Sequence, residues 1–502
     1  MMMASVMMAA AAYLSYASGL LGSVLAARTL GPLNYGIYAY IIWLAGVAVS
    51  VVNHGLPVSA IKFISESVGA GKEELAGAFH AWLRRAHYWS LCVLGALIFS
   101  VLLIRHPAGW GGHVLVFTAV VLIGAFSKSA YLFRTSVSKG HGIFTVEART
   151  VAVLSLINVL ALLLAWAVGI NLMGMLGIYA GVSLGYWVCA RYLMSKEQIF
   201  LSHEALPDHS RTRLVNHLGW TVALTAIGVF SEGSVNIYAL NEFVGSSEVG
   251  YYTIAAGLTK AGMDLLTVGL SSVLMSEMSH AAGKDGLPGL TRVFRGAVKN
   301  FHFFGLLLVG FGFLSAEWAV HLLYGDRYNA AVVVVKVMFV FGGVTLSEGV
   351  FASLLSVLDR QRDRVLINAA SLLITVPVSF LLIRWYGLDG AVCAYAVNRV
   401  LVFVIAVVTS SRMACVYAPW GVMARLTGAM LIALLIPLGV VQIWSGITPG
   451  VISCALFSVI FVAVASRWDI WGQSELDAVM RLTSRIPLIS RLMALILPRH
   501  AR

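Results

Sequence analysis

The sequence predicts an all-α polytopic membrane protein with about 14 transmembrane helices, arranged as two parallel-repeat six-helix bundles plus two C-terminal helices. Three observations predict this class. Charged residues make up 11% of the chain, against about 25% in ordinary soluble domains. Apolar residues, 60% of the chain, form continuous runs of about 20, the length that crosses a bilayer core. The basic residues alternate from loop to loop, as they do in multi-pass membrane proteins.

The predicted spans follow one another with short connections. They lie near residues 7–27, 36–57, 87–105, 113–133, 150–169, 172–194, 217–241, 250–275, 300–324, 330–358, 365–386, 388–409, 421–444 and 447–467. Helices are favoured over a β-barrel because the apolar runs are continuous, whereas barrel strands alternate in polarity. No predicted outer loop is long enough to hold a folded domain.

The orientation follows from the basic residues. Loops after even-numbered spans and the C-terminal tail hold roughly 26 Lys and Arg residues, whereas loops after odd-numbered spans hold only Arg28, Arg105, Arg327 and Arg384. By the positive-inside rule both termini are predicted to be cytoplasmic. The same loops account for the net charge of +12, so a nucleic-acid partner is not expected.

An internal repeat predicts the domain organisation. Gly31–Tyr38 is similar to Gly245–Tyr252, and Gly174–Ala180 is similar to Gly390–Ala396, at an offset of about 212–216 residues. Six helices separate the copies, so both halves have the same orientation. The predicted domains are therefore two six-helix bundles at 1–200 and 201–415, two extra transmembrane helices at 416–467, and an amphipathic basic cytoplasmic tail at 468–502.

Three hairpin segments resemble those of bacterial polysaccharide or oligosaccharide (O-antigen-type) flippases of the MATE-like MOP superfamily. They are Ala27–Tyr38, Leu323–Tyr328 and Tyr386–Ala391. The resemblance implies a transporter that moves an undecaprenyl-diphosphate-linked glycan from the cytoplasmic to the periplasmic leaflet, for O-antigen (lipopolysaccharide), capsule or exopolysaccharide synthesis. Lipid II flippases share the architecture, but their arginine-rich pattern in helix 1 is not found in this sequence.

Ionisable residues inside spans are the candidate site residues, because they are costly in a membrane and usually face a polar cavity. The cations Lys260, Arg399, Lys128, Lys336 and Arg28 are the candidates for binding the diphosphate in a basic cavity. The carboxylates Asp264, Glu232 and Glu348 are the candidates for a coupling ion.

Structural explanations stand beside these roles. Lys260 and Asp264 lie four residues apart and can pair with each other, and the other cations can form ion pairs. Lys128 and Lys336 can snorkel toward the membrane surface, and Arg28 can be an interfacial anchor. Asn53, His54 and Asn236 are weaker cavity candidates.

The sequence carries no motif of an enzyme. Gly69–Glu73 lacks the Walker pattern, no metal cluster or cofactor motif is found, and the protein is expected not to be an enzyme. Two other classes stay open: a cation-coupled multidrug or small-molecule exporter of the same superfamily, and a membrane-embedded glycosyltransferase or polymerase. The expected partners are the lipid-linked oligosaccharide, membrane lipids, and the polymerase and glycosyltransferases that make and use the glycan.

Overall fold

The computed structural model describes residues 2–197, 205–231, 234–358, 360–414, 416–444, 446–468 and 470, and these are helical apart from short connections. The first eight helices are α1 (Met2–Asn53), α2 (Leu56–Gly69), α3 (Glu73–Ile104), α4 (Val114–Gly140), α5 (Thr145–Val168), α6 (Leu172–Ser195), α7 (Asp208–Ser231) and α8 (Ser234–Phe243). The rest are α9 (Ser246–Tyr324), α10 (Ala330–Val344), α11 (Glu348–Val357), α12 (Gln361–Ala414), α13 (Trp420–Ile443) and α14 (Ile447–Arg467). Two single 3₁₀ turns lie at Gly111–His113 and Asp326–Tyr328. Glu232 lies outside the described residues, and so does the predicted tail at 468–502 except for residues 468 and 470.

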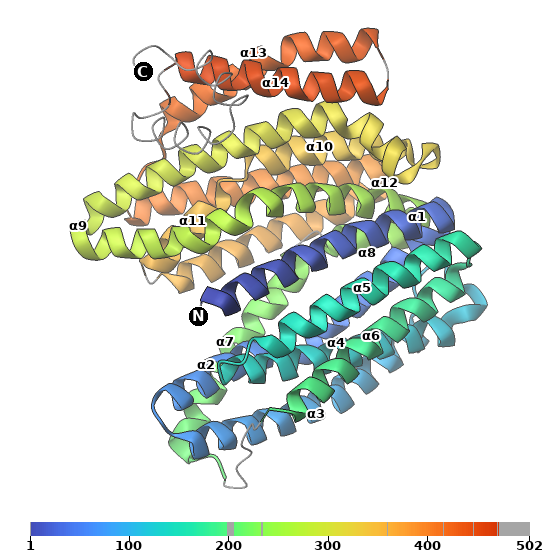
Figure 1. Ribbon diagram of the computed structural model, residues 1–502, viewed down its shortest axis with the longest axis vertical. Coiled ribbons are helices and arrows are strands. Elements are labelled where there is room, and N and C mark those ends of the chain that lie inside the picture. The colour runs from blue at the N-terminus through green and yellow to red at the C-terminus, as the bar shows by residue number, and fades with distance from the viewer. Residues whose placement is uncertain are drawn as a thin grey trace. The chain divides into compact units, whose positions relative to one another are not determined.

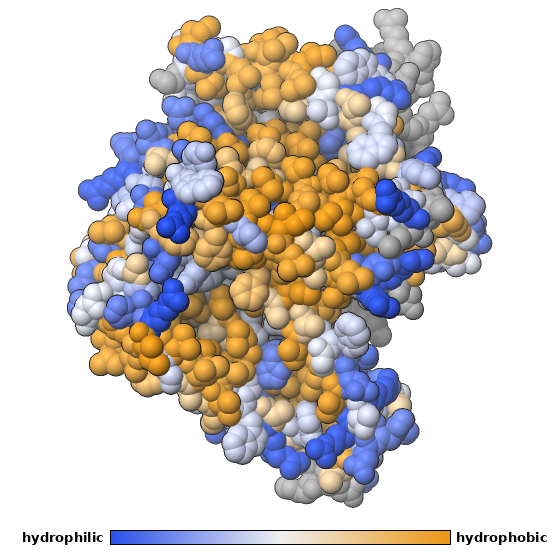
Figure 2. All heavy atoms as spheres, turned by 180° about the vertical axis from the view of Figure 1, so that it is seen from behind, coloured by the Kyte–Doolittle hydropathy of each residue, from blue (hydrophilic) through white to orange (hydrophobic). Residues whose placement is uncertain are grey.

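The helices confirm the predicted all-α, multi-pass class. Within the described residues, ten helical segments are long and apolar enough to cross a membrane, and the bent pair α7–α8 makes an eleventh. Two of these segments, Tyr13–Asn53 of α1 and Val365–Arg412 of α12, hold two predicted spans each, because the helix runs through a sharp turn, whereas Glu277–Tyr324 of α9 holds the predicted span 300–324. Figure 2 shows hydrophobic side chains over the broad middle of the visible face and hydrophilic ones toward its margins, as expected of a protein that faces lipid.

The sharp turns are helical hairpins made at glycine. Gly31 in α1 and Gly387 in α12 have φ of 71° and 58°, a region that glycine adopts without steric cost. The hydroxyls of Ser23 and Tyr35 lie 2.7 Å apart although twelve residues separate them, a spacing of about 18 Å along a straight helix. Gly390 likewise touches the backbone of Leu382. The chain therefore reverses direction at these glycines, between the spans that the sequence predicts.

The described chain forms two compact units. Unit 1 comprises Met1–Thr253 with Val376–Ala391, and unit 2 comprises Ile254–Thr375 with Val392–Arg502. In unit 1, α1 packs on α4 and α5, and α4 packs on α2 and α6 (Figure 1). The predicted division at residues 200 and 415 rests on the repeat, which is a different criterion from compactness, and stays a prediction.

Unit 2 contains α13 and α14 as an antiparallel pair that runs side by side (Figure 1). Phe461 stacks on Phe303 of α9 and on Phe457, with ring centroids 5.1 and 5.6 Å apart. Gly310 of α9 lies directly under the Phe457 ring, where a larger residue would collide. Helix α14 is thus anchored to α9 by close aromatic contacts, and α13 packs against α14.

The two copies of the predicted repeat touch each other inside unit 1. Gly36 lies against the carbonyl of Ser246, and a methyl group on Gly250 would lie 3.0 Å from the carbonyl oxygen of Pro32. Residues 32 and 246, and residues 36 and 250, are repeat equivalents at an offset of 214. Gly36 therefore contacts the equivalent of Pro32, and Gly250, the equivalent of Gly36, contacts Pro32 itself. Such a reciprocal pair of contacts is typical of a two-fold arrangement. The contact therefore has the symmetry that a parallel repeat requires.

Candidate functional site

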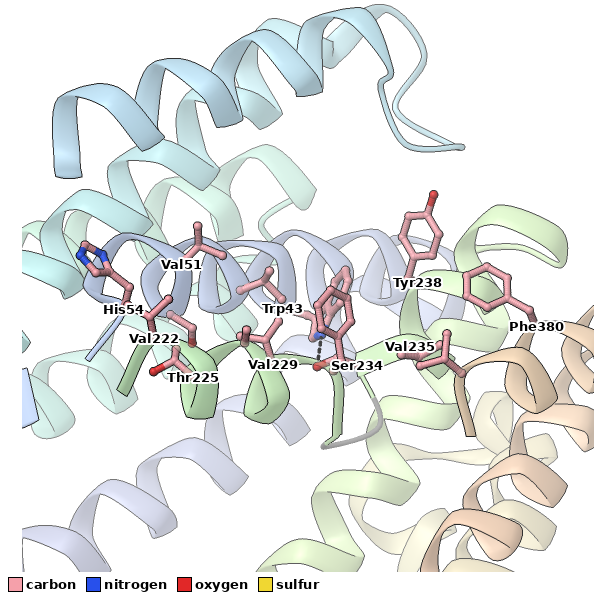
Figure 3. Close-up of a pocket in the computed structure, with 15 residues that line it drawn as sticks. Trp43, Val51, His54, Val222, Thr225, Val229, Ser234, Val235, Tyr238 and Phe380 are labelled. Atoms are coloured by element: carbon pink, nitrogen blue, oxygen red, sulfur yellow. Dashed lines mark hydrogen bonds between the residues drawn. The ribbon is translucent and has the colours of Figure 1, made fainter. Parts of the chain in front are cut away.

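A cavity in unit 1 lies between α1 and the broken helix α7–α8, with the first part of the α12 hairpin closing one end (Figure 3). Its volume is about 430 Å³, and a second, more polar cavity of about 470 Å³ adjoins it and shares six lining residues. Pockets for small molecules have volumes in this range. The helices α7 and α8 meet at a bend of 48°.

The lining is apolar and aromatic, with a few neutral polar groups. The residues of the first cavity are Trp43, Val47, Ser50, Val51, His54, Val222, Thr225, Ala226, Val229, Phe230, Ser234, Val235, Tyr238, Val376 and Phe380. Figure 3 shows Trp43 at the middle of the row, where its indole N–H donates to the Ser234 hydroxyl over 3.2 Å. Of the described residues that line the two cavities, none is an acid, a lysine or an arginine.

His54 reaches this cavity because the helix is interrupted beside it. Helix α1 ends at Asn53 and α2 begins at Leu56, and His54 has the one positive φ, 29°, among non-glycine residues that the structure describes. Strained backbone of this kind costs about 1–3 kcal/mol and is frequent at functional sites. The sequence predicts His54 only as a weaker cavity candidate, and the structure places it in the cavity lining.

A buried hydrogen-bond chain holds the interruption in place. The Ser129 hydroxyl donates to Oδ1 of Asn53 over 2.6 Å, and Nε2 of His87 lies 2.9 Å from the same hydroxyl. The His87 ring stacks on Phe133 with centroids 4.6 Å apart. Asn53 and His87 are both buried, so their polar groups need these partners. The chain ties the end of α1 to α3 and α4 and so positions His54.

Four of the predicted charged residues gather in unit 2. The guanidinium of Arg399 on α12 lies 3.3 Å from Oε2 of Glu348 at the start of α11. Its other nitrogens contact the Tyr395 hydroxyl at 3.3 Å and the Met263 sulfur at 3.2 Å. The side chains of Arg399 and Glu348 keep 23% and 27% of their surface exposed. Arg399 is therefore held in a half-buried ion pair, with all three of its nitrogens engaged.

The second pair lies one residue along α9 from Met263. The ammonium of Lys260 is 3.4 Å from Oδ2 of Asp264, the pairing that the i, i+4 spacing predicts, and the Lys260 side chain stays 68% exposed. Unit 2 therefore holds two cation–carboxylate pairs within predicted spans, and Lys260 is the more exposed of their two cations.

The remaining predicted cations belong to neither of these two ion pairs. Lys128 lies over the ring of Tyr179 at 4.7 Å, and Lys336 lies over the ring of Phe313 at 5.4 Å. Such cation–π contacts offset part of the cost of a charge in an apolar setting. Arg28 is exposed next to the α1 hairpin. The substrate-binding role of all these residues, and the coupling-ion role of Asp264, Glu232 and Glu348, stay predictions.

The comparisons with known proteins agree with this architecture. The model of a family described as "Polysaccharide biosynthesis protein" matches residues 4–275. Among solved structures, the chain is similar to "Lipid II flippase MurJ, inward closed conformation", with 12% identity and a TM-score of 0.73 over 93% of this chain and 99% of that chain. It is also similar to an inward-facing multidrug resistance MATE family transporter of the MOP superfamily, with 15% identity and a TM-score of 0.64 over 80% and 95% of the two chains.

None of the curated proteins matches the chain. At 12% and 15% identity the two solved structures establish the fold and not the substrate. The family model covers more than half of the 502 residues. The chain therefore belongs to the polysaccharide biosynthesis protein family and has the multi-pass fold of MOP-type transporters.

Proposed function

We propose that this protein is a flippase that moves an undecaprenyl-diphosphate-linked oligosaccharide from the cytoplasmic to the periplasmic leaflet of the bacterial inner membrane. The observation that carries the proposal is the match of residues 4–275 to a family of polysaccharide biosynthesis proteins, on a chain whose fold is that of membrane transporters. A polysaccharide pathway needs a transporter where a glycan is assembled on one side of a membrane and used on the other. The protein itself catalyses no bond change in this proposal.

The physical task is to carry a diphosphate and a glycan past hydrocarbon. Charged groups cost several kcal/mol in a bilayer core unless the protein supplies partners. Lys260, with 68% of its side chain exposed, is the cation best placed to meet a diphosphate. Arg399 becomes available when its single contact to Glu348, at 3.3 Å, is exchanged for a phosphate oxygen. Asp264 and Glu348, relieved of their cations, then bind a proton or metal cation that couples transport to an ion gradient.

The transport cycle in this proposal is alternating access with both termini in the cytoplasm. The contact of Gly36 with Ser246 joins hairpins of the first and second halves of the chain at their predicted outer ends. Such a contact closes the outer end in one state and must separate in the other. The partners are membrane lipids, the glycosyltransferases that supply the lipid-linked glycan, and the polymerase that consumes it for O-antigen, capsule or exopolysaccharide.

A second candidate function is a cation-coupled exporter of small molecules. The observation that favours it is the apolar, aromatic lining of the cavity in unit 1, together with the structural similarity to a multidrug resistance MATE transporter. An exporter of this kind handles amphipathic molecules that apolar and aromatic walls hold without a fixed phosphate site. The two candidates differ in their cargo, so a single genetic experiment separates them.

The experiment is deletion of the gene followed by localisation of the lipid-linked glycan. The flippase proposal predicts that undecaprenyl-diphosphate-linked oligosaccharide accumulates on the cytoplasmic leaflet, where an impermeant glycosidase added to spheroplasts cannot reach it. A plasmid copy of the wild-type chain restores accessibility, and a copy with Lys260→Met and Arg399→Met does not. If the deletion leaves the glycan fully accessible and instead sensitises cells to amphipathic cations, the exporter is correct.

A further inference from the structure

The cavity of unit 1 is mostly apolar, but hydroxyl groups that can accept hydrogen bonds also line it. Two of its hydroxyls have their proton engaged by their own helix. The Ser50 hydroxyl donates to the carbonyl of Gly46 over 3.1 Å, and the Thr225 hydroxyl donates to the carbonyl of Thr221 over 2.8 Å. A hydroxyl has one proton and two lone pairs, so each of these oxygens offers only an acceptor to anything inside the cavity. Ser50 on α1 and Thr225 on α7 both line the cavity.

His54 offers an acceptor as well. Its Nδ1 lies 2.9 Å from the carbonyl oxygen of Val52 and 3.3 Å from the Ser90 hydroxyl, whose own proton is donated to Val52. Both neighbours of Nδ1 therefore accept, and Nδ1 carries the ring proton. In the neutral ring the second nitrogen, Nε2, is then unprotonated and accepts a hydrogen bond.

Trp43 supplies a fixed aromatic plane among these acceptors. Its N–H is committed to Ser234, and its ring packs against Tyr40 with centroids 5.2 Å apart. Both contacts restrict the rotation of the indole, so its face is a preformed surface. The cavity thus combines a flat apolar surface with three neutral acceptors, contributed by Ser50, Thr225 and His54.

We infer that this cavity is a carbohydrate subsite that receives neutral sugar residues of the transported lipid-linked glycan. The inference rests on the proposed function and specifies which part of the substrate unit 1 binds. A sugar ring carries several hydroxyl donors at its rim and C–H groups on its faces. The rim donates to Ser50, Thr225 and Nε2 of His54, and one face lies against the Trp43 indole.

The two other parts of the substrate fit this cavity less well. A diphosphate brings acceptors and negative charge, and the described lining offers it no cation. A polyprenyl chain has no donors, so it would leave three acceptors unsatisfied in an apolar setting, which costs free energy at each. The neutral cavity of unit 1 therefore suits the sugar part of the substrate better than its diphosphate or its polyprenyl chain.

The test compares two probes on the full-length protein in nanodiscs. The first is radiolabelled undecaprenyl-diphosphate-linked glycan extracted from the deletion strain, and the second is radiolabelled undecaprenyl diphosphate without sugar. The variant combines Ser50→Ala and Thr225→Val, which remove both hydroxyl acceptors and little else. Losing two hydrogen bonds predicts glycan-lipid binding that is about tenfold weaker or more, with the Kd for undecaprenyl diphosphate changed less than twofold.

A matched control has the same substitutions away from the cavity. Ser100 on α3 and Thr212 on α7 also donate to carbonyls four residues earlier, at 2.9 and 3.0 Å, and neither lines the cavity. Ser100→Ala with Thr212→Val should bind both probes like the wild type.

The subsite is refuted if the cavity variant binds the glycan-lipid as tightly as this control, or loses both probes equally. If the wild-type protein binds neither probe, the proposed function fails as well, and that outcome is distinct from an effect confined to the variant.

Discussion

The contact between the two repeat copies makes a ranked prediction for three glycine-to-alanine substitutions. A methyl group on Gly36 overlaps the Ser246 carbonyl, so the hairpins must separate by at least about 1 Å to restore ordinary contact. A methyl group on Gly250 lies 3.0 Å from Pro32, which an adjustment of a few tenths of an ångström relieves. A methyl group on Gly19, also within α1, meets nothing within 4 Å.

The magnitudes follow from two opposing terms. Alanine in place of glycine inside a helix stabilises by about 1 kcal/mol at all three positions. Forcing a methyl group into a filled space costs about 1–3 kcal/mol, and at Gly36 the obstacle is backbone, which cannot rotate away. We therefore expect Gly36→Ala to lower the free energy of unfolding by about 1–2 kcal/mol, Gly250→Ala to leave it nearly unchanged, and Gly19→Ala to raise it by up to about 1 kcal/mol.

The assay is unfolding of the purified protein in mixed micelles with increasing SDS, followed by tryptophan fluorescence. Comparing the three variants under one protocol cancels errors of extrapolation. The reasoning is refuted if Gly36→Ala is as stable as Gly19→Ala, because the hairpins would then not be in contact. It is also refuted if Gly250→Ala is the more damaging of the two contact variants.

Three further predictions concern the ion pairs. Arg399→Met and Glu348→Met should each destabilise the protein, because each removes the ion pair from a half-buried charge. The double variant should recover at least about 1 kcal/mol of that loss in a double-mutant cycle on SDS unfolding, and additive losses would contradict the pair. Lys260→Met should reduce glycan-lipid transport in cells at least about tenfold, and unchanged transport would remove Lys260 from the site. The hydrogen bond from Arg213 lowers the pKa of Glu66 below its ordinary value of 4.5. The stability that this pair contributes is therefore present above pH 4.5 and is lost as the pH falls through the lowered pKa. In a pH series of thermal unfolding, Glu66→Gln should reduce the loss of stability at acid pH, and an unchanged loss would contradict this.

The turns and the repeat could be predicted from the sequence because a turn has a local signal and a repeat shows as a fixed offset between similar segments. Glycine next to proline or an aromatic residue between apolar runs predicts a turn, and Gly31 and Gly387 are the turns of two helical hairpins. The repeat was visible as an offset in sequence, and the structure adds that equivalent residues, such as Gly36 and Gly250, meet. The sequence did not indicate that contact, because nothing in a repeat shows which of its positions lie near the axis.

The partners of the charged residues could be predicted only where they are close in sequence. Lys260 and Asp264 are four residues apart, so helix geometry alone brings them together. Arg399 and Glu348 are 51 residues apart, and Arg399 and Met263 are 136 apart, so their contacts depend on how α9, α11 and α12 pack. Hydropathy marks each of these residues as unusual within a span but does not say which of them meet.

The cavity was the least predictable feature. Its walls are valines and aromatic residues that in sequence look like any lipid-facing span. Ser50 and Thr225 resemble other helix hydroxyls that donate to carbonyls four residues earlier, such as that of Thr212. What distinguishes them is the space beside them, which arises from the interruption at His54 and the bend between α7 and α8. The first break has a local signal, because Gly55, with φ of 88°, and Pro57 at the start of α2 follow His54, but that signal does not show that a cavity lies beside the break.

Reconstitution tests the central claim, that this chain alone carries a lipid-linked glycan across a bilayer. Purified protein in proteoliposomes would receive fluorescent undecaprenyl-diphosphate-linked glycan on the outer leaflet only, and an impermeant glycosidase would report the fraction that has crossed with time. The account predicts that wild-type vesicles protect the glycan far faster than protein-free vesicles, and that Lys260→Met with Arg399→Met returns the rate to the protein-free level. Equal rates in wild-type and protein-free vesicles, under both a proton and a sodium gradient, would contradict it.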